Sequence, residues 1–206
     1  MSRTRSTTAA LLTLPLAAAA LLATAATPAT ARPAPSLTCQ GKGVDAEALV
    51  RARTETVIDA SLSTVWKLQT DVERWPSWQT HVTSMDRLTH GPFRPGAAFR
   101  WTTPIPPDPA TPATSLDITS TVRQVERGSC IRWTGPAVGE GLHIDGVHVW
   151  SFQEVRGGVL VRTEETHTGE QVQANVPYAT EILKQGLEAW LGELKAAAEA
   201  RSCPRG

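Results

Sequence analysis

One long amphipathic helix at the C-terminal end constrains the fold most. From Pro177 to about Arg201 there is no further proline, and the composition is rich in Ala, Leu, Glu and Lys, which favour helix. Apolar residues recur there at helical spacing and form one continuous stripe: Leu183, Leu187, Trp190, Leu194 and Ala197. A helix of about 24 residues spans about 36 Å, so it needs an equally long apolar surface to cover.

The chain before this helix is dominated by strand patterns. Alternating or apolar runs predict strands over residues 53–60, 82–88, 97–103, 115–125, 130–134, 142–155 and 159–167. Arg156-Gly157-Gly158 predicts a hairpin turn between the last two strands. Successive strands with short turns indicate an antiparallel sheet. The proline-rich segment 104–113 predicts a loop or an extended excursion.

Two short helical segments follow the first predicted strand. Ser61 offers a capping hydroxyl, and a short helix with an apolar side formed by Val65, Trp66 and Leu68 is expected to end near Asp71. Residues 73–78 suit another helical turn, interrupted by Pro76. Residues 44–51 are ambiguous between a short helix and the lead-in to a strand. The long helix and the sheet each have one apolar face, so they are expected to pack together in an α+β fold.

Residues 1–31 predict a secretory signal. Arg3 and Arg5 form a positive start, residues 9–26 are an Ala/Leu-rich run broken by Pro15, and residues 29–31 supply the small residues of a cleavage site. Cleavage after Ala25 and an uncleaved membrane anchor are the alternatives. We expect a secreted or cell-envelope protein whose mature chain has no stable membrane insertion.

The domain organisation that follows is simple. We expect an N-terminal linker over residues 32–49, one domain over residues 50–202 and a tail over residues 203–206. Loss of both leader arginines changes the formal net charge from +0 to about −2. This charge argues against nucleic acid as a partner, because a polyanion would not be attracted. The oligomeric state stays open.

Three cysteines predict one disulfide and one remaining thiol in an exported chain. Cys39 and Cys203 flank the regular elements in irregular, polar surroundings, and we predict that they pair. Cys130 begins a predicted strand, where a lone cysteine usually behaves as a small buried hydrophobe. Three free thiols are the alternative.

Five segments resemble one known group of proteins when they are taken in order. They are T-V-I-D-A-S-L-S-T-V-W (56–66), D-V-E-R-W-P-S-W (71–78), R-P-G-A-A-F-R-W (94–101), H-V-W-S-F-Q-E-V-R-G-G-V-L-V-R-T-E-E-T-H-T-G (148–169) and L-E-A-W-L-G-E-L-K-A-A-A-E (187–199). Over residues 50–200 the chain resembles the SRPBCC superfamily, with its START-like lipid carriers, birch-pollen allergen group and polyketide cyclase/dehydrase branch. The resemblance implies a helix-grip fold: a curved antiparallel sheet of six or seven strands wrapped around the long C-terminal helix, with a ligand cavity between them.

In that fold the two tryptophans of segment 71–78 would lie at one end of the sheet. Trp75 and Trp78 would close the core there, or Trp78 would line the ligand entrance. Side chains expected to line the cavity are Trp78, Phe99, Trp101, His148, Trp150, Phe152, Glu165, His167, Leu183 and Leu187.

Alternation along the last hairpin identifies candidate polar groups in that cavity. His148 shares a strand face with Trp150 and Phe152, and Glu165 shares one with His167. A carboxylate and an imidazole in an apolar pocket are suited to acid/base catalysis, which makes His148 and Glu165 the candidate catalytic residues. A β-bulge would invert this assignment.

No metal-binding, nucleotide-binding or hydrolase motif occurs, so we predict no metal and no cofactor. Three hypotheses remain. The first is an exported carrier or binding protein for a small hydrophobic, lipid- or polyketide-like ligand. The second is a polyketide cyclase/dehydratase-like enzyme that uses the His and Glu residues. The third is a protein whose seven tryptophans fill the interior, leaving only surface contacts.

Overall fold

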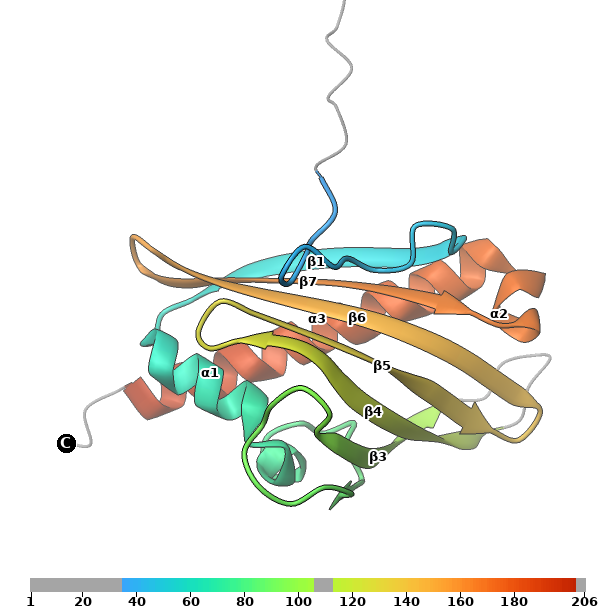
Figure 1. Ribbon diagram of the computed structural model, residues 1–206, viewed down its shortest axis with the longest axis horizontal. Helices are drawn as coiled ribbons and strands as arrows, with labels where there is room; N and C mark the ends of the chain where they lie inside the picture. The colour runs from blue at the N-terminus through green and yellow to red at the C-terminus, as the bar shows by residue number, and fades with distance from the viewer. Residues whose placement is uncertain (1–34, 106–112, 203–206) are drawn as a thin grey trace, which may run out of the picture. The chain divides into compact units, whose positions relative to one another are not determined.

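The computed structural model describes residues 35–105 and 113–202. The predicted leader 1–31, residues 32–34 and the predicted tail 203–206 lie outside the described residues. Seven strands, three α-helices and one 3-10 helix follow one another in these residues (Figure 1): β1 (Val50–Ile58), α1 (Leu62–Thr70), η1 (Val72–Ser77), β2 (Ser84–Arg87), β3 (Ala98–Ile105), β4 (Thr114–Glu126), β5 (Cys130–Gly139), β6 (Leu142–Val155), β7 (Gly158–Thr168), α2 (Glu170–Ala174) and α3 (Val176–Ser202).

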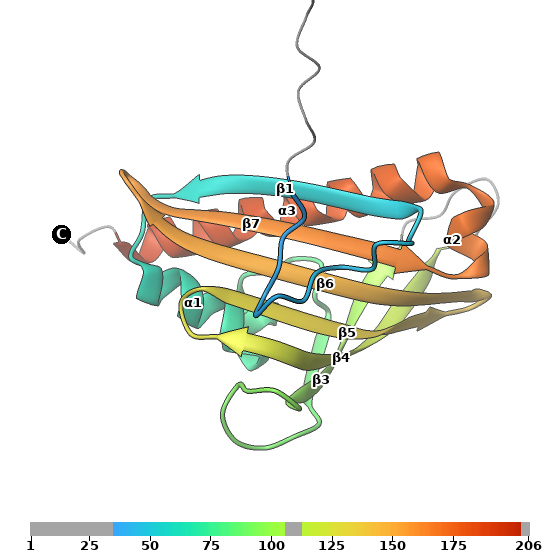
Figure 2. The ribbon, with the colours of Figure 1, turned by 45° about the horizontal axis from the view of Figure 1, so that its top comes forward.

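The seven strands form one antiparallel sheet in the order β1-β7-β6-β5-β4-β3-β2. The sheet is curved, and α3 runs along its concave face with α2 at one end and α1 at the other (Figures 1 and 2). The predicted helix-grip α+β fold is therefore confirmed. Several bounds differ from expectation: α2 was not predicted, β3 continues through Pro104 to Ile105, β5 continues to Gly139, and β1 begins at Val50.

The helices after β1 lie close to where the sequence predicts, with η1 beginning one residue earlier than expected. Ser61 caps α1, and its Oγ accepts a hydrogen bond from the backbone N–H of Thr64 at 3.2 Å. The following 3-10 helix η1 contains Pro76 and buries Trp75, whose Nε1 donates to the carbonyl of Gln69 at 3.2 Å. This bond satisfies the indole N–H in the core, so the bulky ring is held at the α1 end of the sheet.

Two paired glycines lie on the concave face in the middle of the sheet. Gly135 of β5 is opposite Gly146 of β6. A Cβ on Gly135 would lie 1.8 Å from the carbonyl oxygen of Thr119 in β4, so only glycine fits where these two strands approach each other. We infer that this close approach, together with the register shift between Val122 and Gln124, accommodates the curvature of the sheet.

The interior consists of two apolar clusters that α3 connects. The larger cluster lies toward α1 and includes or contacts all seven tryptophans: Trp66, Trp75, Trp78, Trp101, Trp133, Trp150 and Trp190. The smaller cluster lies toward α2 and consists of aliphatic side chains, among them Leu183 and Leu187 of α3 and Ile144 of β6. The two halves of the concave face therefore differ in chemistry.

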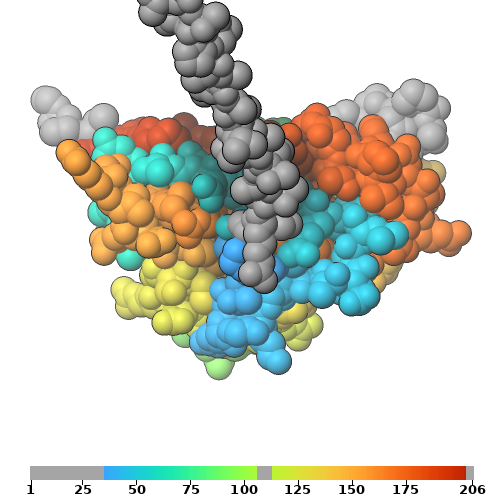
Figure 3. Space-filling model, turned by 90° about the horizontal axis from the view of Figure 1, so that it is seen from above, coloured from blue at the N-terminus to red at the C-terminus, as the bar shows by residue number. Residues whose placement is uncertain are grey.

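Residues 35–49, which we call the N-terminal strap, lie across part of the convex face of the sheet (Figures 2 and 3). The backbone N–H of Leu37 donates to Glu164 Oε2 at 2.6 Å, and Arg51 pairs with the same buried carboxylate. Farther along, the N–H of Asp45 donates to Thr166 Oγ1 at 3.2 Å. The expectation of a linker over residues 32–49 is wrong for this part, because the strap packs on the sheet.

The disulfide joins Cys39 of the strap to Cys130 at the start of β5, with a Cα–Cα distance of 5.4 Å. The predicted Cys39–Cys203 bond is therefore wrong, and Cys203 itself lies outside the described residues. The error follows from the linker assignment, because a free linker would not bring Cys39 to the sheet. Both sulfurs are buried beside Leu37 and Val149 on the convex face.

Candidate functional site

Three of the polar residues predicted to face inward lie side by side on the concave face. His148 Nδ1 is 3.2 Å from Glu165 Oε2, and His167 Nε2 is 3.4 Å from Glu165 Oε1. His148 and Glu165 are directly opposite each other in the β6–β7 pairing, and His167 is opposite Gly146. We call these three residues the His–Glu–His cluster.

The surroundings of His148 fix the orientation of its ring and decide which ring nitrogen carries the proton. Its Nε2 is 2.6 Å from the hydroxyl of Thr163, its ring stacks on Trp150 at 4.8 Å, and Trp133 meets it edge-on at 5.2 Å. Because a carboxylate only accepts hydrogen bonds, the proton belongs on Nδ1, facing Glu165. Nε2 then accepts the Thr163 hydroxyl proton, so both ring nitrogens are used.

Burial and mutual attraction set the charges of the cluster. Burial lowers the pKa of His148 to about 4, although the attraction of Glu165 opposes this shift. Burial alone would raise the pKa of Glu165, but the attraction of His148 and the hydrogen bond and charge of His167 together hold it below its usual range. At neutral pH the cluster therefore contains a neutral His148 imidazole beside an ionised carboxylate.

This arrangement predicts a pH-dependent stability. The unfolded chain protonates His148 near its ordinary pKa of 6.5, whereas the folded protein does so only near 4. Between these values the unfolded state binds more protons, so we expect the free energy of unfolding to fall by about 2 kcal/mol from pH 7.5 to pH 5. The depressed pKa of Glu165 adds a further loss at still lower pH.

Urea unfolding at both pH values measures this loss. His148→Gln should flatten the dependence, and His143→Gln should not, because the His143 side chain is 58% exposed. An unchanged slope in His148→Gln would show that other groups cause the effect.

Next to the cluster, the concave face is apolar and its side chains are only partly buried. The partly buried hydrophobic residues that pack on the smaller core cluster are Ile105, Ile118, Ala137, Leu142, Val176 and Ala179. Leu183 and Leu187 of α3 form the opposite wall and are buried. A Cβ on Gly146 would lie 3.4 Å from Glu165 Oε1 and 3.4 Å from the carbonyl oxygen of Gly135, so a side chain at this position would lie against the carboxylate. We call this region the open end of the concave face.

The other side chains expected to line a cavity lie at the opposite end and are tightly packed. Phe99, Trp150 and Phe152 are at most 4% exposed and belong to the larger core cluster with the half-buried Trp101. Trp78 is also half-buried, and its ring centroid is 6.3 Å from that of Trp190. At this end the tryptophans fill the interior, as in the third hypothesis. Of the residues expected to line a cavity, those at the open end keep the partly buried apolar surroundings and the polar cluster expected of a ligand site.

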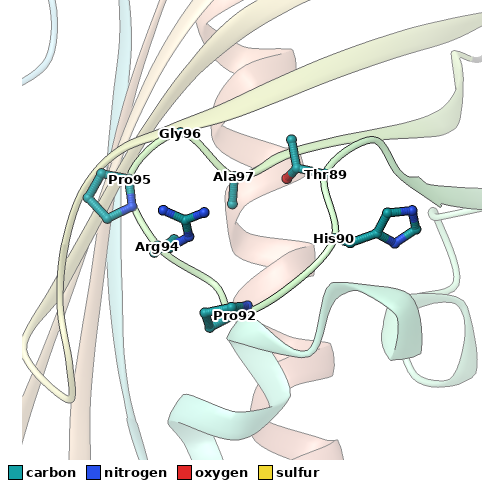
Figure 4. A pocket seen from close by; sticks show the side chains of 7 residues that line it. All are labelled: Thr89, His90, Pro92, Arg94, Pro95, Gly96 and Ala97. Atoms are coloured by element: carbon teal, nitrogen blue, oxygen red, sulfur yellow. The ribbon is translucent and has the colours of Figure 1, made fainter.

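The surface of the described residues includes two hollows away from α3. The larger has a volume of about 300 Å³ and is lined by Trp66, Phe93, Val125 and Arg127. The smaller measures about 130 Å³ and lies inside the loop between β2 and β3 (Figure 4), where it is lined by Thr89, His90, Pro92, Arg94, Pro95, Gly96 and Ala97. Residues of α3 line neither hollow.

Within the described part of the chain, no three His, Cys, Asp or Glu side chains are arranged to hold a metal ion. No helix found there is long and apolar enough to cross a membrane.

A comparison with protein families gives a match over residues 50–199 to the family described as "Polyketide cyclase / dehydrase and lipid transport". The chain belongs to this family. The match confirms the SRPBCC resemblance. It also supports a ligand-binding or cyclase-type role for the matched domain. No curated protein matches the chain.

Solved structures support the same fold at low sequence identity. A START superfamily protein from Mycobacterium smegmatis matches with a TM-score of 0.58 and 15% identity, covering 73% of this chain and 97% of that one. A protein from Thermus thermophilus gives 0.58 and 16%, covering 74% and 99%. The di-domain ARO/CYC StfQ from the steffimycin biosynthetic pathway gives 0.58 and 17%, covering 74% of this chain but only 51% of that protein.

For this family member, sequence reasoning missed the groups that shape the site. Thr163 lies two residues before Glu165 and so shares its strand face, but its bond to His148 was not foreseen. Gly146 interrupts the inward series between Ile144 and His148, and this interruption was the available signal for a gap beside the cluster. The structural role of Gly135 could not be read from the sequence, because it depends on the close approach of β4 in space.

Proposed function

We propose that this protein is exported and binds a small, mostly apolar molecule at the open end of the concave face, between the sheet and α3. The observation that carries the proposal is the His–Glu–His cluster beside partly buried aliphatic side chains. Such a combination gives an apolar body a surface to cover and gives a polar group of the ligand a fixed partner.

The energetics favour a ligand with few polar atoms. Each methylene buried against the aliphatic wall contributes about 0.8 kcal/mol. One hydroxyl of the ligand can donate to Glu165, which is ionised and already fixed by two imidazoles. Because these side chains are held before binding, little entropy is lost at the polar contact.

Two features support export. The leader-like composition of residues 1–31 is one. The Cys39–Cys130 disulfide is the other, since such bonds persist in oxidising compartments. The charge balance continues to argue against nucleic acid as a partner.

Titration with 1-decanol, an apolar chain with one hydroxyl, tests the binding site. We expect saturable binding by calorimetry, weakened at least about tenfold by Gly146→Leu, which removes several favourable methylene contacts. Val147→Leu is the matched control, because the neighbouring side chain projects from the other face of β6. Ala137→Leu, at a partly buried inward position, is a second blocking variant should Gly146→Leu fold poorly. Equal affinity in the blocked and control variants would refute the site.

A second candidate function, a cyclase-type enzyme, is favoured by one observation. His167 places Nε2 against Glu165, while its Nδ1 has no partner in the described residues. A histidine oriented by a carboxylate and free at its other nitrogen can move a proton in an aldol cyclisation. Turnover of a poly-β-ketone substrate should then fall at least about a hundredfold in Glu165→Gln or His167→Asn. Unchanged turnover in both variants, or no turnover by the parent protein, would refute the enzyme hypothesis and leave ligand binding as the proposed function.

A further inference from the structure

The larger surface hollow lies at the opposite end of the sheet from the open end. Its four lining residues come from three regions: Trp66 from α1, Phe93 from the β2–β3 loop, and Val125 and Arg127 from the end of β4 and the turn after it. Val125 is opposite Ile131 in the β4–β5 pairing, whereas the open end begins where Ile118 is opposite Ala137. The two regions are thus separated along the same pair of strands.

The apolar walls of this hollow rest on the rigid core. Trp66 meets Phe152 edge-on with ring centroids 5.2 Å apart, and Phe93 lies 6.3 Å from Phe99. Trp66, Phe93 and Val125 are all only partly buried, although each packs against the larger core cluster. A ligand that covered these three side chains would bury apolar surface without any rearrangement of the core.

Arg127 is the charged residue of the lining. It makes no ion pair or hydrogen bond with any described residue, and it lies in the tight turn whose Gly128 has φ +74°. The nearby loop over residues 88–97 contains no acidic residue. The Arg94 side chain of that loop points into the smaller hollow (Figure 4). The larger hollow therefore presents one unpaired guanidinium beside two aromatic rings and a valine.

We propose that this hollow is a second binding site, which takes a small amphipathic carboxylate. The apolar body, aromatic or branched, packs against Trp66, Phe93 and Val125, and the carboxylate pairs with Arg127. A guanidinium matches a carboxylate with two parallel hydrogen bonds. A volume of about 300 Å³ is at the small end of ligand pockets, which favours a compact acid over a long lipid chain.

The test uses the full chain and naphthalene-2-carboxylate, with naphthalene-2-carboxamide as the neutral probe of nearly the same shape. We expect the acid to shift the indole N–H resonance of Trp66, assigned with Trp66→Phe. We also expect it to bind at least about tenfold more tightly than the amide. Arg127→Gln should remove this preference, and Arg156→Gln, an equal charge change in the β6–β7 turn, should leave it intact.

Three results would overturn the proposal. The first is equal binding of acid and amide. The second is an equal effect of Arg127→Gln and Arg156→Gln, which would indicate a general charge effect. The third is binding that Gly146→Leu abolishes while the Trp66 indole N–H resonance does not shift, which would place the acid at the open end. Phe93→Ala is the additional variant, because it removes a wall of the hollow and should weaken acid and amide alike.

Discussion

Replacing Trp75 with alanine is expected to lower the free energy of unfolding by about 3–5 kcal/mol, the largest single-residue effect we predict. The Trp75 side chain is fully buried, and its ring contacts those of Phe99, Trp101, Trp133 and Trp190 at centroid distances of 5.3, 6.1, 6.0 and 4.8 Å. Removing the ring leaves a cavity among stiff aromatic neighbours, which cannot collapse around it.

Urea unfolding followed by circular dichroism measures this loss. Trp78→Ala is the matched control, because the same residue type lies three positions away, is only half buried and meets one ring, that of Trp190. We expect the control to lose much less stability. Equal losses would show that Trp75 is not the centre of the aromatic core.

Removing the Cys39–Cys130 disulfide is expected to cost about 2–5 kcal/mol. The bond joins residues 91 positions apart, so its loss frees a long loop in the unfolded chain. In the folded protein it also releases the strap from the convex face, where Leu37 and Cys39 are buried. The double variant Cys39→Ala/Cys130→Ala should therefore unfold at a lower urea concentration than the parent protein.

Peptide mapping under non-reducing conditions checks the pairing itself. It should recover a cross-linked peptide that contains Cys39 and Cys130, and Cys203→Ala should keep both this cross-link and the stability of the parent. A cross-link between Cys39 and Cys203 would contradict the structure and restore the pairing expected from the sequence.

The parts of the fold that depend on local patterns were predictable. The apolar stripe of α3 and the alternation along β6 and β7 are properties of consecutive residues. The inward direction of His148 and Glu165 also followed from alternation, because the β6–β7 register is unbroken from the Asp145–Thr168 pair to the turn. A single bulge would have separated the two side chains.

The parts that depend on contacts between distant segments were not predictable. The strap looks like a linker because its proline- and glycine-containing sequence has no periodicity, yet Glu164 and Cys130 hold it from far along the chain. Alternation likewise shows that Phe99 and Trp150 face inward, but it does not show whether their rings line a hollow or fill it. That depends on Trp75 and Trp190, which come from η1 and α3.

The glycine pair in the centre of the sheet affects both the packing of the strands and the surroundings of Glu165. Gly135 allows β4 and β5 to come together, and its partner Gly146 places no side chain against Glu165. A side chain at Gly146 would contact both Glu165 and the backbone carbonyl of Gly135, so a substitution made to alter the surroundings of the carboxylate would also act on the packing of the two strands. Relatives that take larger or smaller guests are therefore expected to differ along the aliphatic walls, while this pair stays glycine.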